Sequence, residues 1–407
     1  MINIEEPDQV TRITPLFRLA FRPFFLGGAL FSMIALLMWG VSWLAAMAWV
    51  PYGGWVWWHA HEMIFGFVVA IMSGFLLTAV KNWTGLAGFS GWPLAGLFLL
   101  WMLARLLLFY PIAAIEVILP WLDMGFLIAV AAIMGRLVWR ARQMQQMIFI
   151  VILLLLAVAN AQMHWAVASG NSGLAREASH SAIFMLVLVI VILGGRVIPA
   201  FTANGTGTAR LADRPMIELL SIGTVVLLVL LHITGLKQFL ADYVLGGLFL
   251  GTALVHLWRF FRWRPWVTAK VPLLWSLHLA YCFIVVGFFL CAYYFLAPFV
   301  GGISLHYATI LHSFTVGGAG LMILSMMSRV SLGHTGRPLQ INRWLAFGFL
   351  CIVMAYVCRI WLPLLAPNVS HYWSYLASIV LWLLGYGLFV SCFLPILTRP
   401  RIDGRAG

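Results

Sequence analysis

The chain carries very few charged residues. Asp, Glu, Lys and Arg together make up 9% of its 407 residues. Soluble globular domains carry about a quarter charged residues, because their surface must face water. Hydrophobic residues instead make up 64% of this chain. The composition therefore excludes a soluble protein.

Long polar segments are also missing. Apolar runs of about twenty residues recur along the chain, and each could cross roughly 30 Å of hydrocarbon as a helix. The loops between them are too short to hold a soluble domain. Because lipid cannot hydrogen-bond to an exposed backbone and these runs are too long for barrel strands, they must be helices. The predicted fold class is an all-α, polytopic integral membrane protein that contacts the lipid bilayer.

Cysteine-based motifs are absent as well. The five cysteines fall within apolar runs, and none forms a CxxC spacing or a CxxCH haem attachment motif. They indicate core packing, and any haem would be bound non-covalently. The first 22 residues are acidic and then basic, without the short apolar core and cleavage site of a secretory signal. We therefore expect the first helix to act as its own insertion signal.

The basic residues predict how the chain lies in a membrane. With twelve spans, nineteen of the 24 Lys and Arg residues fall on the side that holds both termini, and two fall on the other side. Because cytoplasmic loops carry the Lys and Arg excess, both termini are predicted to be cytoplasmic. The net charge of +13 then reflects topology, since the scattered basic residues form no face for nucleic acid. The predicted spans are 24–49, 57–80, 92–111, 113–138, 147–168, 180–203, 215–235, 239–260, 271–296, 305–328, 341–364 and 372–397.

The sequence predicts one domain. Residues 1–407 form a single transmembrane helical domain, with a cytoplasmic N-terminal segment at 1–22 and a cytoplasmic tail at 398–407. No internal repeat is visible in the sequence, which weakens a transporter hypothesis, although inverted repeats are often hidden at this level.

Eight of the eleven histidines fall in the outer half of the predicted spans or at its edge. Neutral imidazole is a common transition-metal ligand and the usual axial ligand of haem iron. His164, which ends the fifth span, is one candidate metal ligand. The alternative is that histidines at the interface keep one polar edge in water, as Trp and Tyr do. The clustering favours a metal or haem centre near the outer face.

The stretch WWHAHEMIFGF at 57–67 opens the second span with three polar residues. On a helix, His59 and His61 point about 200° apart and cannot easily share one ion. Glu62, if it faces the interior, needs a partner, a proton or a metal ion. The alternative is a helix entry with side chains that reach the interface.

His312 lies about two turns into the tenth span, followed by three glycines in HSFTVGGAG. The glycines would admit a flat macrocycle or a closely packed helix, and both alternatives stay open. His312 is the best buried candidate for an axial ligand. His278 in PLLWSLHLAY could reach a cofactor or bond to a neighbouring helix.

Charged residues inside the spans must pair with an opposite charge or contact water. Asp123 in the fourth span and Arg105 in the third are expected to form an ion pair, with Asp123 in a proton path as the alternative. Arg196 in GGRVIPAFT could bind a haem propionate, since guanidinium binds carboxylate bidentately, or could extend to the interface.

Six stretches of the chain carry a resemblance to a known family. They are FRPFFLGG (21–28), WHAHEMIFGF (58–67), GFLLTAVKNWTG (74–85), GGRVIPAFT (194–202), LLWSLH (273–278) and SRVSLGHTGRPL (328–339). In this order they resemble the NnrS family of bacterial inner-membrane proteins, which contain haem and copper and are linked to nitric oxide metabolism and nitrosative stress. The resemblance covers essentially the whole chain and implies a multi-pass protein of the bacterial inner membrane.

The resemblance implies a non-covalent b-type haem and copper as cofactors. We expect His312 with His61 or His278 on the haem iron, and His59 with another outer histidine on copper. His334 lies in a loop whose Ser, Gly and Pro residues predict a structured cytoplasmic turn. The family pattern covers His59, His61, Glu62, Arg196, His278, His312 and His334.

The leading hypothesis is therefore a haem and copper protein that binds or reduces nitric oxide in the outer leaflet and protects against nitrosative stress. As an oxidoreductase it would use Glu62 and Asp123 as proton donors, with electrons from quinol or a separate protein. One alternative is a transporter for copper, haem or a metal–nitrosyl complex. The other is a non-catalytic nitric oxide sensor or scaffold.

Overall fold

The computed structural model describes residues 13–45, 47–212, 214–302, 305–366 and 371–404. Within these residues every regular element is a helix, and twelve helices are long and apolar enough to cross a membrane. This confirms the predicted all-α polytopic fold and the number of spans. The cytoplasmic position of both termini and the single domain stay predictions, and the segments 1–22 and 398–407 lie partly outside the described residues.

The described chain divides into two compact units. Unit 1 consists of the chain up to Ser179, Met327–Leu339 and the chain from Tyr386 onward. Unit 2 consists of His180–Met326 and Gln340–Gly385. Helices α8 (Ser172–Thr206), α13 (Leu321–His334) and α16 (His371–Leu397) contribute residues to both units.

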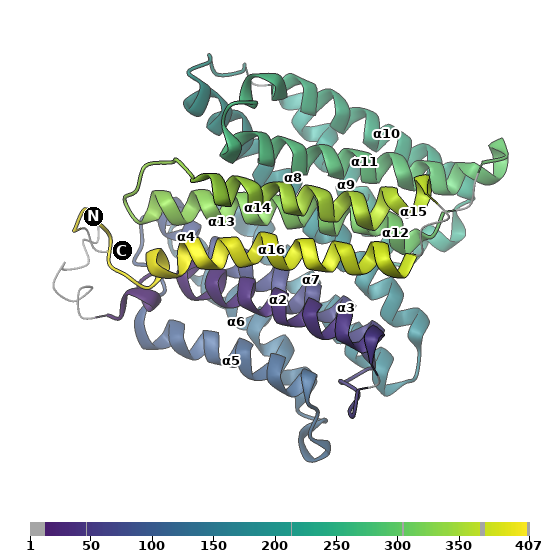
Figure 1. The fold of residues 1–407 in the computed structure, drawn as a ribbon, viewed down its shortest axis with the longest axis horizontal. Coiled ribbons are helices and arrows are strands. Elements are labelled where there is room, and N and C mark those ends of the chain that lie inside the picture. The colour runs from purple at the N-terminus through teal and green to yellow at the C-terminus, as the bar shows by residue number, and fades with distance from the viewer. Residues whose placement is uncertain (1–12, 46, 213, 303–304, 367–370, 405–407) are drawn as a thin grey trace. The chain divides into compact units, whose positions relative to one another are not determined.

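The helices of unit 1 run side by side (Figure 1). The second span is one continuous helix in three parts, with a central π-helical segment, η2. It ends where Gly85 adopts the left-handed conformation at φ 66°, which glycine reaches without strain. The elements are α2 (Phe21–Leu44), α3 (Trp55–His61), η2 (Glu62–Val68), α4 (Val69–Thr84), α5 (Gly91–Phe109), α6 (Leu119–Arg140) and α7 (Met147–Ala168).

Two long helices of unit 2 begin with proline. Pro215 and Pro272 occupy the first positions of α9 and α11, where the missing N–H would have no helical acceptor. The Asn342 side chain caps α14 by accepting a hydrogen bond from the Leu345 N–H at 2.9 Å. The elements are α9 (Pro215–Ile233), α10 (Asp242–Arg262), α11 (Pro272–Val300), α12 (Tyr307–His312), η7 (Ser313–Gly320), α14 (Arg343–Tyr356), η8 (Val357–Trp361) and α15 (Leu362–Leu365).

The second and tenth spans share the same local irregularity. The π-helix η2 begins directly after His61, and the π-helix η7 begins directly after His312, 251 residues later. The glycines that follow these spans, Gly85 and Gly336, are also 251 residues apart and both have positive φ. π-helices are rare and occur frequently at functional sites. The two spans therefore share a local geometry at a constant spacing of 251 residues.

Two residue types recur at a similar spacing in the fourth and twelfth spans. Trp121 and Trp373 lie near the starts of α6 and α16 and are 252 residues apart. Gly135 and Gly387 are also 252 residues apart, and they lie five and ten residues before the ends of these helices.

Candidate metal centre

A buried carboxylate on α6 is the centre of a polar cluster in unit 1. The Oδ2 atom of Asp123 lies 3.1 Å from His61 Nε2 and 3.1 Å from His164 Nε2. It also accepts a hydrogen bond from Asn160 Nδ2 at 2.8 Å. At most 3% of any of these four side chains is exposed. Three helices therefore deliver two imidazoles and a carboxylate to one buried point.

Three of these residues form a group that could hold a metal ion. One ligand atom each from His61, Asp123 and His164 lie within 4.8 Å of one another. Asn160 and His164 are four residues apart on α7, so both project from the same face of that helix. Nitrogen and carboxylate oxygen donors suit divalent ions such as Cu²⁺ and Zn²⁺. The cluster formed by His61, Asp123 and His164 is called the metal centre below.

Two further charged residues complete the surroundings of the metal centre. Arg105 on α5 forms an ion pair with Asp123 and a second one with Glu62 Oε1 at 2.9 Å. Glu62 Oε1 also lies 2.9 Å from His61 Nδ1. The predicted pairing of Arg105 with Asp123 is confirmed. Glu62 and Asp123, the two predicted proton donors, lie in the same cluster.

If the histidines are neutral, the charges of the side chains at and around the metal centre do not sum to zero. Two carboxylates, on Glu62 and Asp123, face one guanidinium, on Arg105, and all three side chains are buried. An unbalanced charge within a membrane span is costly. Both ring nitrogens of His61 face oxygen acceptors, on Glu62 and Asn160, so a protonated His61 would satisfy them. A metal cation bound at Nε2 of His61 would supply the missing positive charge in place of that proton.

Unmet polar atoms also mark the cluster. Glu62 Oε2, Arg105 Nε and His164 Nδ1 are buried and have no hydrogen-bond partner. Native proteins satisfy most buried polar atoms, so such a group calls for an ion, a proton or water. The donor set, the charge and the unmet Glu62 Oε2 and His164 Nδ1 atoms fit a bound cation, whereas Arg105 Nε is a donor that calls for an acceptor such as water.

Aromatic rings enclose the histidines. Trp57 stacks on His61 with ring centroids 4.4 Å apart, and its indole donates a hydrogen bond to the Met163 carbonyl at 3.0 Å. Tyr52, in the loop before α3, lies 5.5 Å from the His164 ring. Burial, together with the nearby Glu116 carboxylate, raises the pKa of Tyr52, so this phenol stays neutral. These contacts fix the orientations of the His61 and His164 rings.

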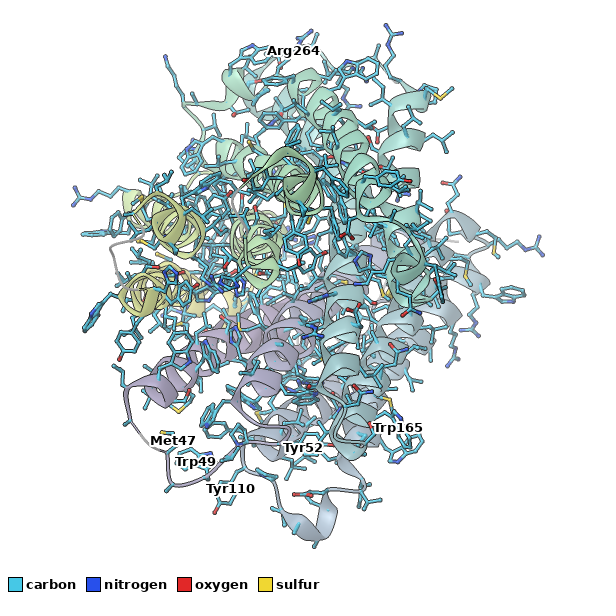
Figure 2. The ribbon with its side chains drawn as sticks, turned by 90° about the vertical axis from the view of Figure 1, so that its right-hand side faces the viewer. Met47, Trp49, Tyr52, Tyr110, Trp165 and Arg264 are labelled. Carbon is cyan, nitrogen blue, oxygen red and sulfur yellow. The ribbon has the colours of Figure 1, made fainter. Side chains whose placement is uncertain are left out.

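This end of unit 1 carries exposed aromatic side chains. Figure 2 labels Tyr52, Tyr110 and Trp165 at this end of the unit. Tyr110 and Trp165 are 63% and 66% exposed. Aromatic belts of this kind mark the boundary between membrane and water. The metal centre therefore lies just inside the end of the helices.

Gly66, in the π-helix η2, makes room for the cluster. An added Cβ would lie 2.9 Å from Glu62 Oε2 and 2.5 Å from a ring carbon of Phe31. We expect Gly66→Ala to lower the free energy of unfolding by about 1–3 kcal/mol, the usual cost of overpacking. Thermal unfolding of the purified protein measures this. Gly96→Ala on α5 is the control, because a Cβ there meets open space. Equal stability of the two variants would contradict the prediction.

His59 lies apart from the metal centre. Its ring stacks on Trp39 with centroids 4.7 Å apart and an interplanar angle of 12°. The helical separation of about 200° therefore puts His59 and His61 in different surroundings, as predicted. The assignment of His59 to copper with another histidine stays a prediction.

The glycines after His312 serve helix packing. Added Cβ atoms at Gly317 and Gly320 would collide with Tyr356 and Trp382, so neighbouring side chains fill the space next to these glycines. Of the two alternatives, close helix packing is the one that the structure shows here. His312 itself is half-buried, and its Nδ1–H donates to the Ala308 carbonyl at 2.6 Å.

The other two predicted cofactor residues also lie in unit 2. His278 is buried, with Nε2 2.8 Å from the Thr202 hydroxyl and no partner at Nδ1. Arg196 has an exposed side chain on α8. Their roles toward a cofactor stay predictions.

A second buried polar network ties three helices of unit 2 together. The Tyr281 hydroxyl donates to His256 Nδ1 at 2.5 Å, and His256 Nε2 donates to the Ser221 carbonyl at 3.1 Å. Arg259 donates to Tyr281 at 3.1 Å and pairs with Glu218. Both nitrogens of His256 have partners and the two charges cancel, so this network is structural.

Sequence reasoning missed the role of Asn160. Its amide donates to Asp123 and its carbonyl oxygen accepts from His61, so it joins the two ligands. The available signal was its spacing of four from His164, within an otherwise apolar span.

The fold and the metal centre define a class: a polytopic helical membrane protein with a buried centre that could hold a metal ion. The family model described as "NnrS protein" matches residues 15–401, nearly the whole chain. The chain belongs to the NnrS family. A search of curated proteins returns no match to it.

Proposed function

We propose that this protein binds copper and haem and uses them to bind or reduce nitric oxide, which protects the cell against nitrosative stress. The buried cluster of His61, Asp123 and His164 is the observation that carries the proposal. Because imidazole and carboxylate ligands suit Cu²⁺, this cluster is the proposed copper site. When bound, copper and haem supply one-electron redox chemistry and sites for nitric oxide.

His312 is the proposed axial ligand of the haem. Its Nδ1–H bond to the Ala308 carbonyl leaves Nε2 as the nitrogen with the lone pair, which is the usual arrangement of a metal-binding histidine. Arg359 is a candidate partner for a haem propionate. Its guanidinium lies 4.0 Å from the Tyr375 ring centroid and 3.5 Å from the Thr309 hydroxyl, and it pairs with no carboxylate in the described part of the chain.

Glu62 is the better of the two candidate proton donors. Reduction of two nitric oxide molecules to nitrous oxide and water consumes two protons and two electrons. Glu62 Oε2 is buried without a partner, whereas both oxygens of Asp123 are engaged. Glu62 Oε2 is therefore the carboxylate oxygen of the two at which a proton would meet no competing donor. Electrons would come from quinol or from a separate protein in the bacterial inner membrane.

Anaerobic addition of nitric oxide to the purified, reduced protein tests this function. Optical spectra would report haem and its nitric oxide complex, and gas analysis would report nitrous oxide. A shifted haem band with nitrous oxide supports reduction, and a shifted band without it supports sensing. Protein that contains neither haem nor copper would overturn the proposal and leave transport as the better hypothesis.

We expect His312→Ala to lose the haem absorbance while keeping the ion at the metal centre, because no ligand of that centre is changed. The readouts are haem per chain from the optical spectrum and metal per chain by elemental analysis. His306→Ala is the control, since His306 is exposed and adjoins the same helix. Full haem in both variants would refute the assignment of His312.

A further inference from the structure

Three of the six motifs that carry the family resemblance meet at one end of unit 1. The Phe21 N–H at the start of α2 donates to the Thr78 hydroxyl near the end of α4 at 3.0 Å. The Phe21 ring also lies 5.5 Å from the ring of His334, the last residue of α13. The metal centre lies at the opposite end of the second span, so it does not explain this convergence.

The residues at this end form an arginine cluster, defined as Arg18, Arg22, Arg337 and Arg401. Arg22 is 0% exposed and Arg18 is 8% exposed. The other three guanidinium groups lie close enough to Arg22 to repel it electrostatically. Arg401 donates two hydrogen bonds to the Asp403 carboxylate, at 2.8 and 2.6 Å. Four guanidinium groups therefore lie together at this end of unit 1.

Only one of the three guanidinium nitrogens of Arg22 has hydrogen-bond partners. Its Nη1 group donates to the carbonyls of Leu397 and Arg399 at 3.0 and 2.7 Å, which caps the end of α16. Its Nε and Nη2 groups are buried and have no hydrogen-bond partner. Unmet donors on a buried cation are costly, and the surrounding arginines add to that cost.

We propose that the arginine cluster binds a phosphate-bearing anion. Guanidinium groups bind phosphate oxygens bidentately, so a phosphate among these side chains would satisfy Arg22 and cancel the repulsion. The cluster lies at helix ends, where basic side chains meet the headgroups of anionic lipids. The phosphate comes either from a lipid headgroup or from a soluble anion. This site shares no residue with the proposed copper and haem sites.

The thermal unfolding midpoint of the full-length protein in nanodiscs tests this site. Wild type in phosphatidylcholine is compared with wild type in phosphatidylglycerol, and with phosphatidylcholine plus inorganic phosphate. Arg337→Gln is the main variant, because Arg337 is half-exposed and its own hydrogen bond, to the Thr335 carbonyl, is long at 3.4 Å. Arg18→Gln is the second variant. Arg140→Gln is the control, since Arg140 is an exposed basic residue elsewhere in unit 1.

We expect the anion to raise the unfolding midpoint of wild type and Arg140→Gln. Each arginine removed from the cluster should weaken the apparent affinity about fivefold. A response to phosphatidylglycerol alone identifies a lipid headgroup, and a response to inorganic phosphate identifies a soluble anion. The proposal is overturned if neither raises the midpoint, or if Arg337→Gln and Arg18→Gln respond as Arg140→Gln does.

Discussion

Asp123→Asn is expected to abolish metal binding at the metal centre and to destabilise the protein. Asparagine keeps the size of the side chain but removes the charge. Its amide group would also face N–H donors from Asn160 or Arg105 in place of an acceptor. Because Asp123 is itself a proposed ligand, metal affinity should fall by more than the roughly 10- to 100-fold typical of losing an outer-shell partner. Breaking one side of a buried ion pair adds a loss of about 3–5 kcal/mol in unfolding free energy.

Equilibrium dialysis of the purified variant against Cu²⁺, followed by elemental analysis, measures the first effect. Thermal unfolding measures the second. Asp242→Asn is the matched control, since Asp242 is an exposed carboxylate in the first turn of α10. If the Asp123 variant retained the full metal content of wild type, the ion would have to lie elsewhere, and the copper assignment to this cluster would be withdrawn.

Sequence alone predicted the fold class, the number of spans and the pairing of Arg105 with Asp123. These predictions depend on the cost of placing polar backbone and charge in hydrocarbon, a cost that is independent of how the helices pack. His61, Glu62, Asp123 and His164 were each candidates for the same reason. A charged or imidazole side chain inside an apolar run has few environments in which its burial costs little free energy.

The composition of the cluster could not be predicted, because it depends on the register of neighbouring helices. Asn160 and His164 meet Asp123 only through the packing of α6 against α7. The backbone around Glu62 is also irregular, since η2 is a π-helix, which shifts the faces that a regular helix would present. The helical period of 3.6 residues therefore does not predict which side chains near Glu62 face the metal centre.

The second and tenth spans differ in the residues that follow their shared histidine position. At the spacing of 251 residues, Glu62 corresponds to Ser313, and at 252 residues Asp123 corresponds to Tyr375. Of these four positions, only Glu62 and Asp123, both in unit 1, carry carboxylates.

Arg105→Gln is expected to make the stability of the protein depend on bound metal. The substitution leaves the carboxylates of Glu62 and Asp123 buried without their guanidinium, at a cost of about 3–5 kcal/mol in the metal-free protein. A divalent cation at the metal centre would neutralise both carboxylates. At 100 times its dissociation constant, such an ion stabilises the folded state by about 2.7 kcal/mol. Added Cu²⁺ or Zn²⁺ should therefore recover most of the lost thermal stability.

A second substitution separates charge balance from packing. Glu62→Gln in the Arg105→Gln background removes one buried carboxylate and leaves all three metal ligands unchanged. The double variant should therefore be more stable than Arg105→Gln without metal, and should gain less when metal is added. Arg136→Gln, on an exposed position of α6, controls for loss of any arginine. If added metal raised the thermal stability of all these variants equally, Arg105 would not compensate the charge of the buried carboxylates. Charge compensation predicts a larger gain for Arg105→Gln than for Arg136→Gln or the double variant.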